Sequence, residues 1–173
     1  MINEGVKNDF ISSGIFDANY WLWGFECAID DVNGALKNVT DLGKKVICYE
    51  NHDTVSDAYD NRLENRYGNE ICDAILVVTF TSGAVPFIYN GTEIADSARH
   101  SLWSNRIYGN NLCVDWSEAV TEKGRKRTEL IKKLSSIYHN ISAINKGSTE
   151  VLSDSKTVAA YRKSYNGHEV IVA

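Results

Sequence analysis

Apolar and polar positions in the first third of the chain predict a helix followed by a strand. Between Phe25 and Leu42, apolar residues recur every three or four positions, which is typical of one buried helical face, and Gly43 favours a helix end. Val46–Tyr49 is a short continuous apolar run, as in a strand that is buried on both sides. Residues 1–25 contain many aromatic side chains but show weak periodicity, so the pattern predicts no element there.

A second helix and a second strand are predicted further along. Residues 54–68 are polar and indicate a loop, after which residues 71–78 follow helical spacing. Val85–Tyr89 is the next candidate for a buried strand, and Pro86 lies near its start, where a missing backbone donor is tolerated. Residues 91–127 form a long polar segment, and a segment of that length in a compact domain is usually functional.

The period changes near residue 147. Apolar residues mark one face of a helix over residues 128–145. Residues 157–162 and 169–173 then have the character of strands, and Asn166-Gly167 between them is a strong hairpin signal. The pattern therefore predicts two domains, residues 1–147 and residues 148–173, the second of which begins an antiparallel β region.

The alternation of helices and strands before that boundary predicts an α/β fold with parallel strands. Two strands are too few for such a sheet, because both would keep unpaired edges. The sequence also ends within an apolar strand. We therefore expect the chain to be a piece of a larger protein.

Composition excludes some partners. The chain has 173 residues, 43% of them hydrophobic and 24% charged, with a net charge of −5 and a pI near 5.4. A mildly acidic chain is a poor candidate for nucleic acid or anionic membranes, and no apolar run is long enough to span a bilayer. The densest basic stretch, residues 123–127, is predicted to be a solvated loop that leads into a helix.

Four cysteines lie far apart, and their spacing argues against metal or redox use. We expect buried free thiols, which weakly favour a reducing, cytoplasmic compartment. Residues 1–5 lack the features of a signal peptide, but the compartment of a larger parent protein is left open.

The candidate chemistry lies directly after the first predicted strand, in Asn51-His52-Asp53. Polar residues at the carboxyl ends of parallel strands build the active sites of barrel enzymes. The alternative is that this segment only caps a turn, since Asn and Asp are common in turns.

Two motifs together resemble a known family. Tyr49-Glu50-Asn51-His52-Asp53 resembles the fourth conserved region of the α-amylase family of glycoside hydrolases (family 13), which reads aromatic-x-Asn-His-Asp. Residues 86–93, Pro-Phe-Ile-Tyr-Asn-Gly-Thr-Glu, resemble that family's Pro-x-Ile-Tyr-x-Gly-x-Glu at the eighth barrel strand. The resemblance covers residues 40–173 and is fainter before them. It implies the last strands and helices of a (β/α)8 barrel, followed by the start of a C-terminal β domain.

The resemblance also implies roles for single residues. Asp53 would be the third catalytic carboxylate, which binds sugar hydroxyls and favours the distorted, oxocarbenium-like ring. His52 would donate to hydroxyls of the same sugar, and Asn51 would orient the turn near the substrate. Tyr49 and Glu50 fit the motif as spacing and support.

Further residues near these motifs have structural alternatives. Glu93 and Asp96 are expected to hold the loop after the second strand. Arg62 and Arg66 are expected either to pair with carboxylates near the site or to form solvated salt bridges. His100, His139 and His168 are isolated and are expected at surface or helix positions. Trp103 and Trp116 could stack on a sugar or pack under the long loop that contains them.

Part of the implied site is absent from this sequence. A retaining glycosidase needs a nucleophile and a general acid, with the two carboxyl groups about 5–5.5 Å apart. In the family these residues follow the fourth strand, in Gly-x-Arg-x-Asp, and the fifth strand, in a Gly-Glu context. Neither motif precedes Asn51. No cofactor or metal is expected in this chain, and the family's calcium sites would lie in the rest of a parent protein.

Three functions remain open from the sequence. The first is part of an α-amylase-type hydrolase that acts on α-glucans such as starch or maltooligosaccharides. The second is a non-catalytic relative that binds carbohydrate or assists assembly. The third is a small α/β module whose likeness to the family is fortuitous.

Overall fold

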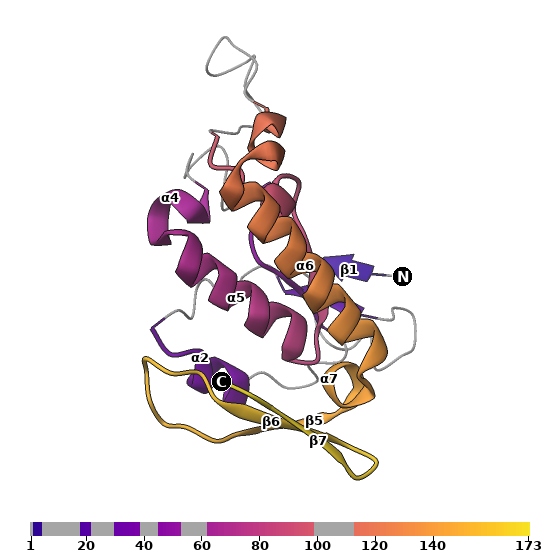
Figure 1. The fold of residues 1–173 in the computed structure, drawn as a ribbon. Helices are drawn as coiled ribbons and strands as arrows, with labels where there is room; N and C mark the ends of the chain where they lie inside the picture. Colours follow the sequence, from indigo (N-terminus) through magenta and orange to yellow (C-terminus); the bar gives the residue numbers. More distant parts are fainter. Residues whose placement is uncertain (1, 5–17, 22–29, 39–44, 53–61, 99–112) are drawn as a thin grey trace.

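Two separate β-sheets organise the chain (Figure 1). The structure, a computed structural model, describes residues 2–4, 18–21, 30–38, 45–52, 62–98 and 113–173, the first two ranges as backbone only. The elements, in chain order, are β1 (Ile2–Glu4), β2 (Ala18–Trp21), α2 (Val32–Asn38), β3 (Lys45–Cys48), α4 (Leu63–Tyr67), α5 (Asn69–Thr81), β4 (Val85–Phe87), the short 3-10 helices η3 (Thr92–Ile94) and η5 (Trp116–Val120), α6 (Glu122–Asn140), α7 (Ser142–Lys146), β5 (Ser148–Val151), β6 (Tyr161–Tyr165) and β7 (His168–Val172).

The first sheet is parallel throughout, and its strands lie side by side in chain order, β1-β2-β3-β4. This confirms the predicted parallel α/β arrangement, with α2 between β2 and β3 and α5 between β3 and β4. The hydrophobic pattern did not predict β1 and β2. Unlike β3, they carry no continuous apolar run, because Asn3, Glu4 and Asn19 interrupt them.

β4 differs from its prediction as a buried strand. Val85 and Pro86 are half-buried, and Phe87 is 40% exposed. The physical reason is that β4 is an edge of the described sheet, with only β3 as a neighbour. Pro86 lies opposite Ile47 in the register and supplies no backbone donor.

Two helical predictions need correction. α4 occupies residues 63–67, within the segment 54–68 that was predicted as a loop, and residues 53–61 lie outside the described residues. The predicted helix over residues 128–145 begins earlier, at Glu122, because Thr121 caps it with a hydroxyl that accepts from the Gly124 N–H at 3.1 Å. The helix is also divided at Ile141, which has an extended backbone and separates α6 from α7.

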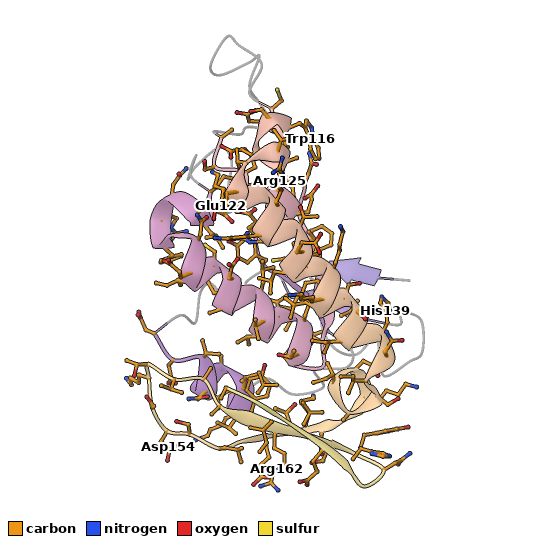
Figure 2. All side chains as sticks on the ribbon, in the orientation of Figure 1. Trp116, Glu122, Arg125, His139, Asp154 and Arg162 are labelled. Atoms are coloured by element: carbon orange, nitrogen blue, oxygen red, sulfur yellow. The ribbon has the colours of Figure 1, made fainter. Side chains whose placement is uncertain are left out.

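The basic stretch 123–127 therefore lies in the first turns of α6 and is no solvated loop. Its last residue, Arg127, is 1% exposed. Other α6 side chains, among them Glu122, Arg125 and His139, are exposed on the outside of the molecule (Figure 2). The exposed position of His139 agrees with the surface role expected for it.

The second sheet is antiparallel, in the order β5-β6-β7. The predicted hairpin at Asn166-Gly167 is confirmed, since both residues have positive φ (50° and 80°) in the turn between β6 and β7. β6 begins at Tyr161, later than the predicted 157. The start of β5 at Ser148 coincides with the proposed boundary, although its status as a domain boundary stays a prediction.

Two side chains tie this sheet to the rest of the chain. The Asn33 amide on α2 donates to the carbonyls of Ser155 and Val158, both at 2.8 Å. The buried Lys163 amine on β6 donates to the Ser82 carbonyl and the Thr149 hydroxyl, both at 2.8 Å. The sheet is thus fixed against α2 and the end of α5.

The core lies between the parallel sheet, α5, α6 and β6. Its buried members are Leu36, Ile47, Tyr49, Leu63, Cys72, Ile75, Leu76, Val78, Phe80, Ala84, Leu134 and Tyr161. None of the helices in the described residues is long and apolar enough to cross a membrane. Cys48 and Cys72 are buried free thiols as expected, Cys113 is exposed against expectation, and Cys27 lies outside the described residues.

Candidate functional site

The carboxyl end of β3 places the predicted site. Val46, Ile47 and Cys48 fill β3 with buried apolar side chains, and burial continues past the end of the strand through Tyr49 and Glu50, both 0% exposed. A carboxylate buried this completely is costly unless it is paired and hydrogen-bonded. Glu50 therefore needs ion-pair and hydrogen-bond partners at this edge of the sheet.

Of the three predicted site residues, two are described. The Asn51 side chain is 1% exposed and its amide donates to the Cys48 sulfur at 3.6 Å, which folds it back against the strand end. His52 follows and is half-buried. Asp53, the predicted third carboxylate, lies outside the described residues, so the structure brings Asn51 and His52 together without placing Asp53.

Glu50 forms a buried ion pair with Arg62. Glu50 Oε1 and Arg62 Nη2 are 2.6 Å apart, and both side chains are 0% exposed. The Thr92 hydroxyl donates to the same Glu50 oxygen at 2.8 Å, and Arg62 Nη1 donates to the Asn90 carbonyl at 2.9 Å. Arg62 Nη1 also lies 4.0 Å from the buried Asp96 carboxylate. We call these residues, Glu50, Arg62, Asn90, Thr92 and Asp96, the Arg62 cluster.

Two buried carboxyl groups, Glu50 and Asp96, face one guanidinium in this cluster. Burial raises the pKa of Glu50 to about 8, although the nearby Arg62 guanidinium opposes the shift.

A second buried arginine lies in the helix layer. Arg127 on α6 binds Glu64 on α4 at 2.7 Å and Asp73 on α5 at 2.6 Å. The Tyr49 hydroxyl donates to the same Glu64 oxygen at 2.9 Å. We call Tyr49, Glu64, Asp73 and Arg127 the Arg127 cluster.

The remaining predicted residues divide by role. Glu93 and Asp96 hold the loop after β4 as expected: the Gly91 N–H donates to Glu93 and the Ala98 N–H to Asp96, both at 2.9 Å. Arg66 lies over the Tyr67 ring, 5.0 Å from its centre, and is exposed. Trp116 is 55% exposed on η5. His168 is exposed on β7, and His100 and Trp103 lie outside the described residues.

Sequence reasoning missed the burial of Arg127 and one residue at the sheet edge. The signal for Arg127 was present, because residues 127, 131 and 134 share the spacing of one helical face. Glu4 is the last residue of β1 and pairs in register with Tyr20 on β2. Through Tyr20, the register aligns Glu4 with Val46 on β3, five residues before Asn51.

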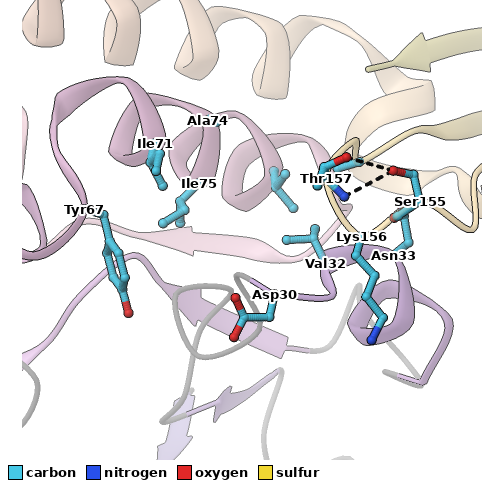
Figure 3. A pocket seen from close by; sticks show the side chains of 12 residues that line it. Asp30, Val32, Asn33, Tyr67, Ile71, Ala74, Ile75, Ser155, Lys156 and Thr157 are labelled. Carbon is cyan, nitrogen blue, oxygen red and sulfur yellow. Dashed lines mark hydrogen bonds between the residues drawn. The ribbon is translucent and has the colours of Figure 1, made fainter.

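A cavity of about 730 Å³ lies elsewhere, between α2, α5 and the segment 155–159 (Figure 3). Val32, Ile71 and Ile75 supply its apolar wall, while Asp30 lies at its side. Neither Asn51 nor His52 lines it. Within the described ranges, no three His, Cys, Asp or Glu side chains stand together as a metal site would require.

Comparisons with known proteins bear on the fold. The chain is similar to an Anoxybacillus alpha-amylase whose structure is said to give insights into a new glycosyl hydrolase subclass. The TM-score is 0.68 and the sequence identity 17%, and the match covers 98% of this chain and 39% of that one. It is also similar to a Salmonella typhimurium protein assigned as an alpha-amylase, with a TM-score of 0.57 and 17% identity over 75% of this chain and 28% of that one.

No family model matches the sequence, and no curated protein matches it either. The chain spans well under half the length of both solved structures. At this level of identity the likeness concerns the fold alone. The chain therefore has an amylase-like fold.

Proposed function

We propose that this chain supplies part of the glucan site of an α-amylase-type glycoside hydrolase. The observation that carries the proposal is the position of Asn51 and His52, which directly follow β3 at the carboxyl edge of an all-parallel sheet in an amylase-like fold. Active sites of parallel barrels lie at this edge.

The strand order supports a section of a (β/α)8 barrel. In doubly wound sheets the strand order reverses at a switch point, whereas barrel strands follow one another around the ring. Here the spatial order β1-β2-β3-β4 equals the chain order. If β3 and β4 correspond to the seventh and eighth barrel strands, β1 and β2 correspond to the fifth and sixth.

Within this proposal His52 donates to sugar hydroxyls, Asn51 orients the turn, and Asp53 stabilises the oxocarbenium-like transition state. Hydrogen bonds that strengthen in the transition state accelerate glycoside cleavage. The substrate class is an α-glucan such as starch or a maltooligosaccharide.

The strand count adds a candidate for the general acid. Glu4 ends β1, the strand that would correspond to the fifth, and the family's acid follows that strand. Asn3 stands where the family has Gly, which is a departure from its motif. We propose Glu4 for this role, and we assign no residue of this sequence as the nucleophile.

Maltoheptaose binding to the full chain tests the proposal, with calorimetry for affinity and sugar release for hydrolysis. Asp53→Asn should weaken binding at least tenfold and lower any turnover by orders of magnitude, with the fold retained. Asp154→Asn is the matched control. Asp154 is exposed, lies between β5 and β6, and pairs with Lys37 on α2. Affinity and turnover that remain at the wild-type level in Asp53→Asn would exclude the assignment.

The same measurements separate the alternative of a carbohydrate-binding or assembly relative. Binding of maltoheptaose that Asp53→Asn leaves at the wild-type level would favour that alternative, because a binding subunit does not depend on a transition-state carboxylate. Loss of sugar release in Glu4→Gln with unchanged affinity would support Glu4 as the acid.

A further inference from the structure

The buried ion pair of the Arg62 cluster joins two points of the chain on either side of the candidate site. Glu50 directly precedes Asn51 and His52, and Arg62 directly precedes α4. Their 2.6 Å contact lies out of water, with both side chains fully buried. The pair therefore fixes the base from which Asn51 and His52 extend.

The pair is anchored in turn to the end of β4. The Thr92 hydroxyl donates to Glu50, and Arg62 donates to the Asn90 carbonyl, so each member has a partner in the segment after β4. The Arg62 guanidinium also lies over the Tyr89 ring, 5.8 Å from its centre. Two neighbouring strand ends, those of β3 and β4, are thus held together by one guanidinium.

Stability alone is a weak reason for such a pair. Removing two charges from water costs as much as their attraction returns, and apolar residues of similar volume often serve equally well. Arginine differs from an apolar side chain because its rigid guanidinium carries several nitrogens: Arg62 Nη1 donates to the Asn90 carbonyl, while Nη2 makes a charge contact with Glu50 that lacks hydrogen-bond geometry. A site needs such rigid connections, because reacting groups must be held to within a fraction of an ångström.

We propose that Glu50 and Arg62 are positioning residues, which set the place of Asn51 and His52 at the carboxyl end of β3 relative to the end of β4. The proposal rests on the proposed function for its consequence in glucan binding. The positioning itself is a property of this chain and can be measured without substrate.

The test compares two double variants of the full chain. Glu50→Gln with Arg62→Met removes both members of the positioning pair together and leaves Asp96 as the one buried carboxylate of the Arg62 cluster. Glu64→Gln with Arg127→Met does the same to the Arg127 cluster and is the matched control. Amide hydrogen exchange of Asn51 and His52 by NMR reports positioning, α5 amides report the fold, and maltoheptaose affinity reports function.

If the proposal holds, the first double variant keeps slow exchange in α5 but speeds exchange at Asn51 and His52 at least tenfold. The control double variant leaves exchange at those two amides within about twofold of wild type. Unchanged exchange at Asn51 and His52 in a folded Glu50→Gln, Arg62→Met variant would overturn the proposal.

Should that variant fail to fold, Arg62→Lys decides instead. Lysine keeps the charge but has a single nitrogen for both Glu50 and Asn90, so faster exchange at Asn51 and His52 is expected, and wild-type exchange overturns the proposal. Absence of maltoheptaose binding by the wild-type chain would count against the proposed function alone. A fall of at least tenfold in affinity alongside faster exchange supports both.

Discussion

Two buried arginines in this chain have similar surroundings but connect different elements of the fold. Arg62 and Arg127 are both at most 1% exposed, and each lies over a tyrosine ring at 5.8 Å. Arg127 connects three helices, through Glu64 on α4 and Asp73 on α5, and it also donates to the Thr92 carbonyl on η3 at 3.3 Å. Arg62 instead connects the ends of two strands, through Glu50 and Asn90.

The partners also differ in their contact with water. Asp73 is 41% exposed, whereas Glu50 and Asp96 are fully buried. A partly solvated carboxylate retains hydration when its arginine is removed, and a buried one does not. Arg127 also has a buried partner, since the Glu64 side chain is 3% exposed, so the two clusters differ in that one of the two carboxylates of Arg127 is solvated and neither of those near Arg62 is.

The largest expected effect is the loss of stability when each arginine is replaced, which we predict to be greater for Arg62 than for Arg127. Arg62→Met should lower the free energy of unfolding by about 3–5 kcal/mol, because it strands buried carboxyl groups. Arg127→Met should cost roughly half as much, since Asp73 remains in water and the Tyr49 hydroxyl still donates to Glu64. Urea unfolding of both variants measures the difference. Equal losses, or a larger loss for Arg127→Met, would contradict it.

The second prediction concerns pH and the Arg62 cluster. Burial raises the pKa of Glu50 to about 8, and an unfolded Glu titrates near ~4.3. The folded state binds this proton more tightly, so stability should fall as the pH rises between these values, by a few kcal/mol at most. Glu50→Gln removes the titrating group and should flatten this decline in urea unfolding measured from about pH 5 to 8.

Lys163 provides an independent reference for that profile. Burial lowers the pKa of its amine to about 8, against ~10.4 in an unfolded chain. The unfolded state then binds the proton more tightly, so stability should rise again from pH 8 towards ~10.4. Lys163→Met should flatten only this alkaline rise. A Glu50→Gln profile parallel to wild type in the acidic range would refute the role given to Glu50.

How far the sequence predicts this molecule depends on the length of each signal. β3, α5 and the β6–β7 hairpin were predicted because a continuous apolar run, a helical period and an Asn-Gly turn each mark them. β1 and β2 were missed because polar residues interrupt them, so neither shows the continuous apolar run that marks β3. Their place is set by neighbours in the sheet, which no local pattern reveals.

The candidate site divides in the same manner. The motif at Asn51 and His52 could be found from residue order alone, and its place after β3 agrees with that prediction. The partner of Arg62 could not be chosen, because a solvated salt bridge and a buried pair look alike in sequence. Only the fold shows that Glu50, Arg62 and Asn90 meet out of water.

A smaller effect tests how tightly the Arg62 cluster is packed. Gly91 has φ +93°, and an added Cβ would lie 3.0 Å from Arg62 Nη2 and 3.1 Å from Asp96. Gly167, in the turn between β6 and β7, has φ +80° with nothing within 4 Å of an added Cβ. Gly167→Ala should therefore cost about 1 kcal/mol from backbone strain alone, and Gly91→Ala about 2–3 kcal/mol. Thermal unfolding compares the two variants. Equal losses of stability would show that the side chains of the Arg62 cluster move aside for the extra methyl group and that the cluster is not tightly packed.

The smallest effect comes from the solvated side of the Arg127 cluster. Asp73→Asn should lower stability by about 0.5–1 kcal/mol, because Asp73 is 41% exposed and a pair in water is weak. Salt sharpens the contrast: at about 1 M NaCl exposed charges are screened within roughly 3 Å, so the cost of Asp73→Asn should vanish. The cost of Arg62→Met should persist in the same salt, since no ion reaches a pair whose side chains are fully buried. If salt removes both costs alike, the Arg62 pair is open to solvent and the distinction between the two clusters fails.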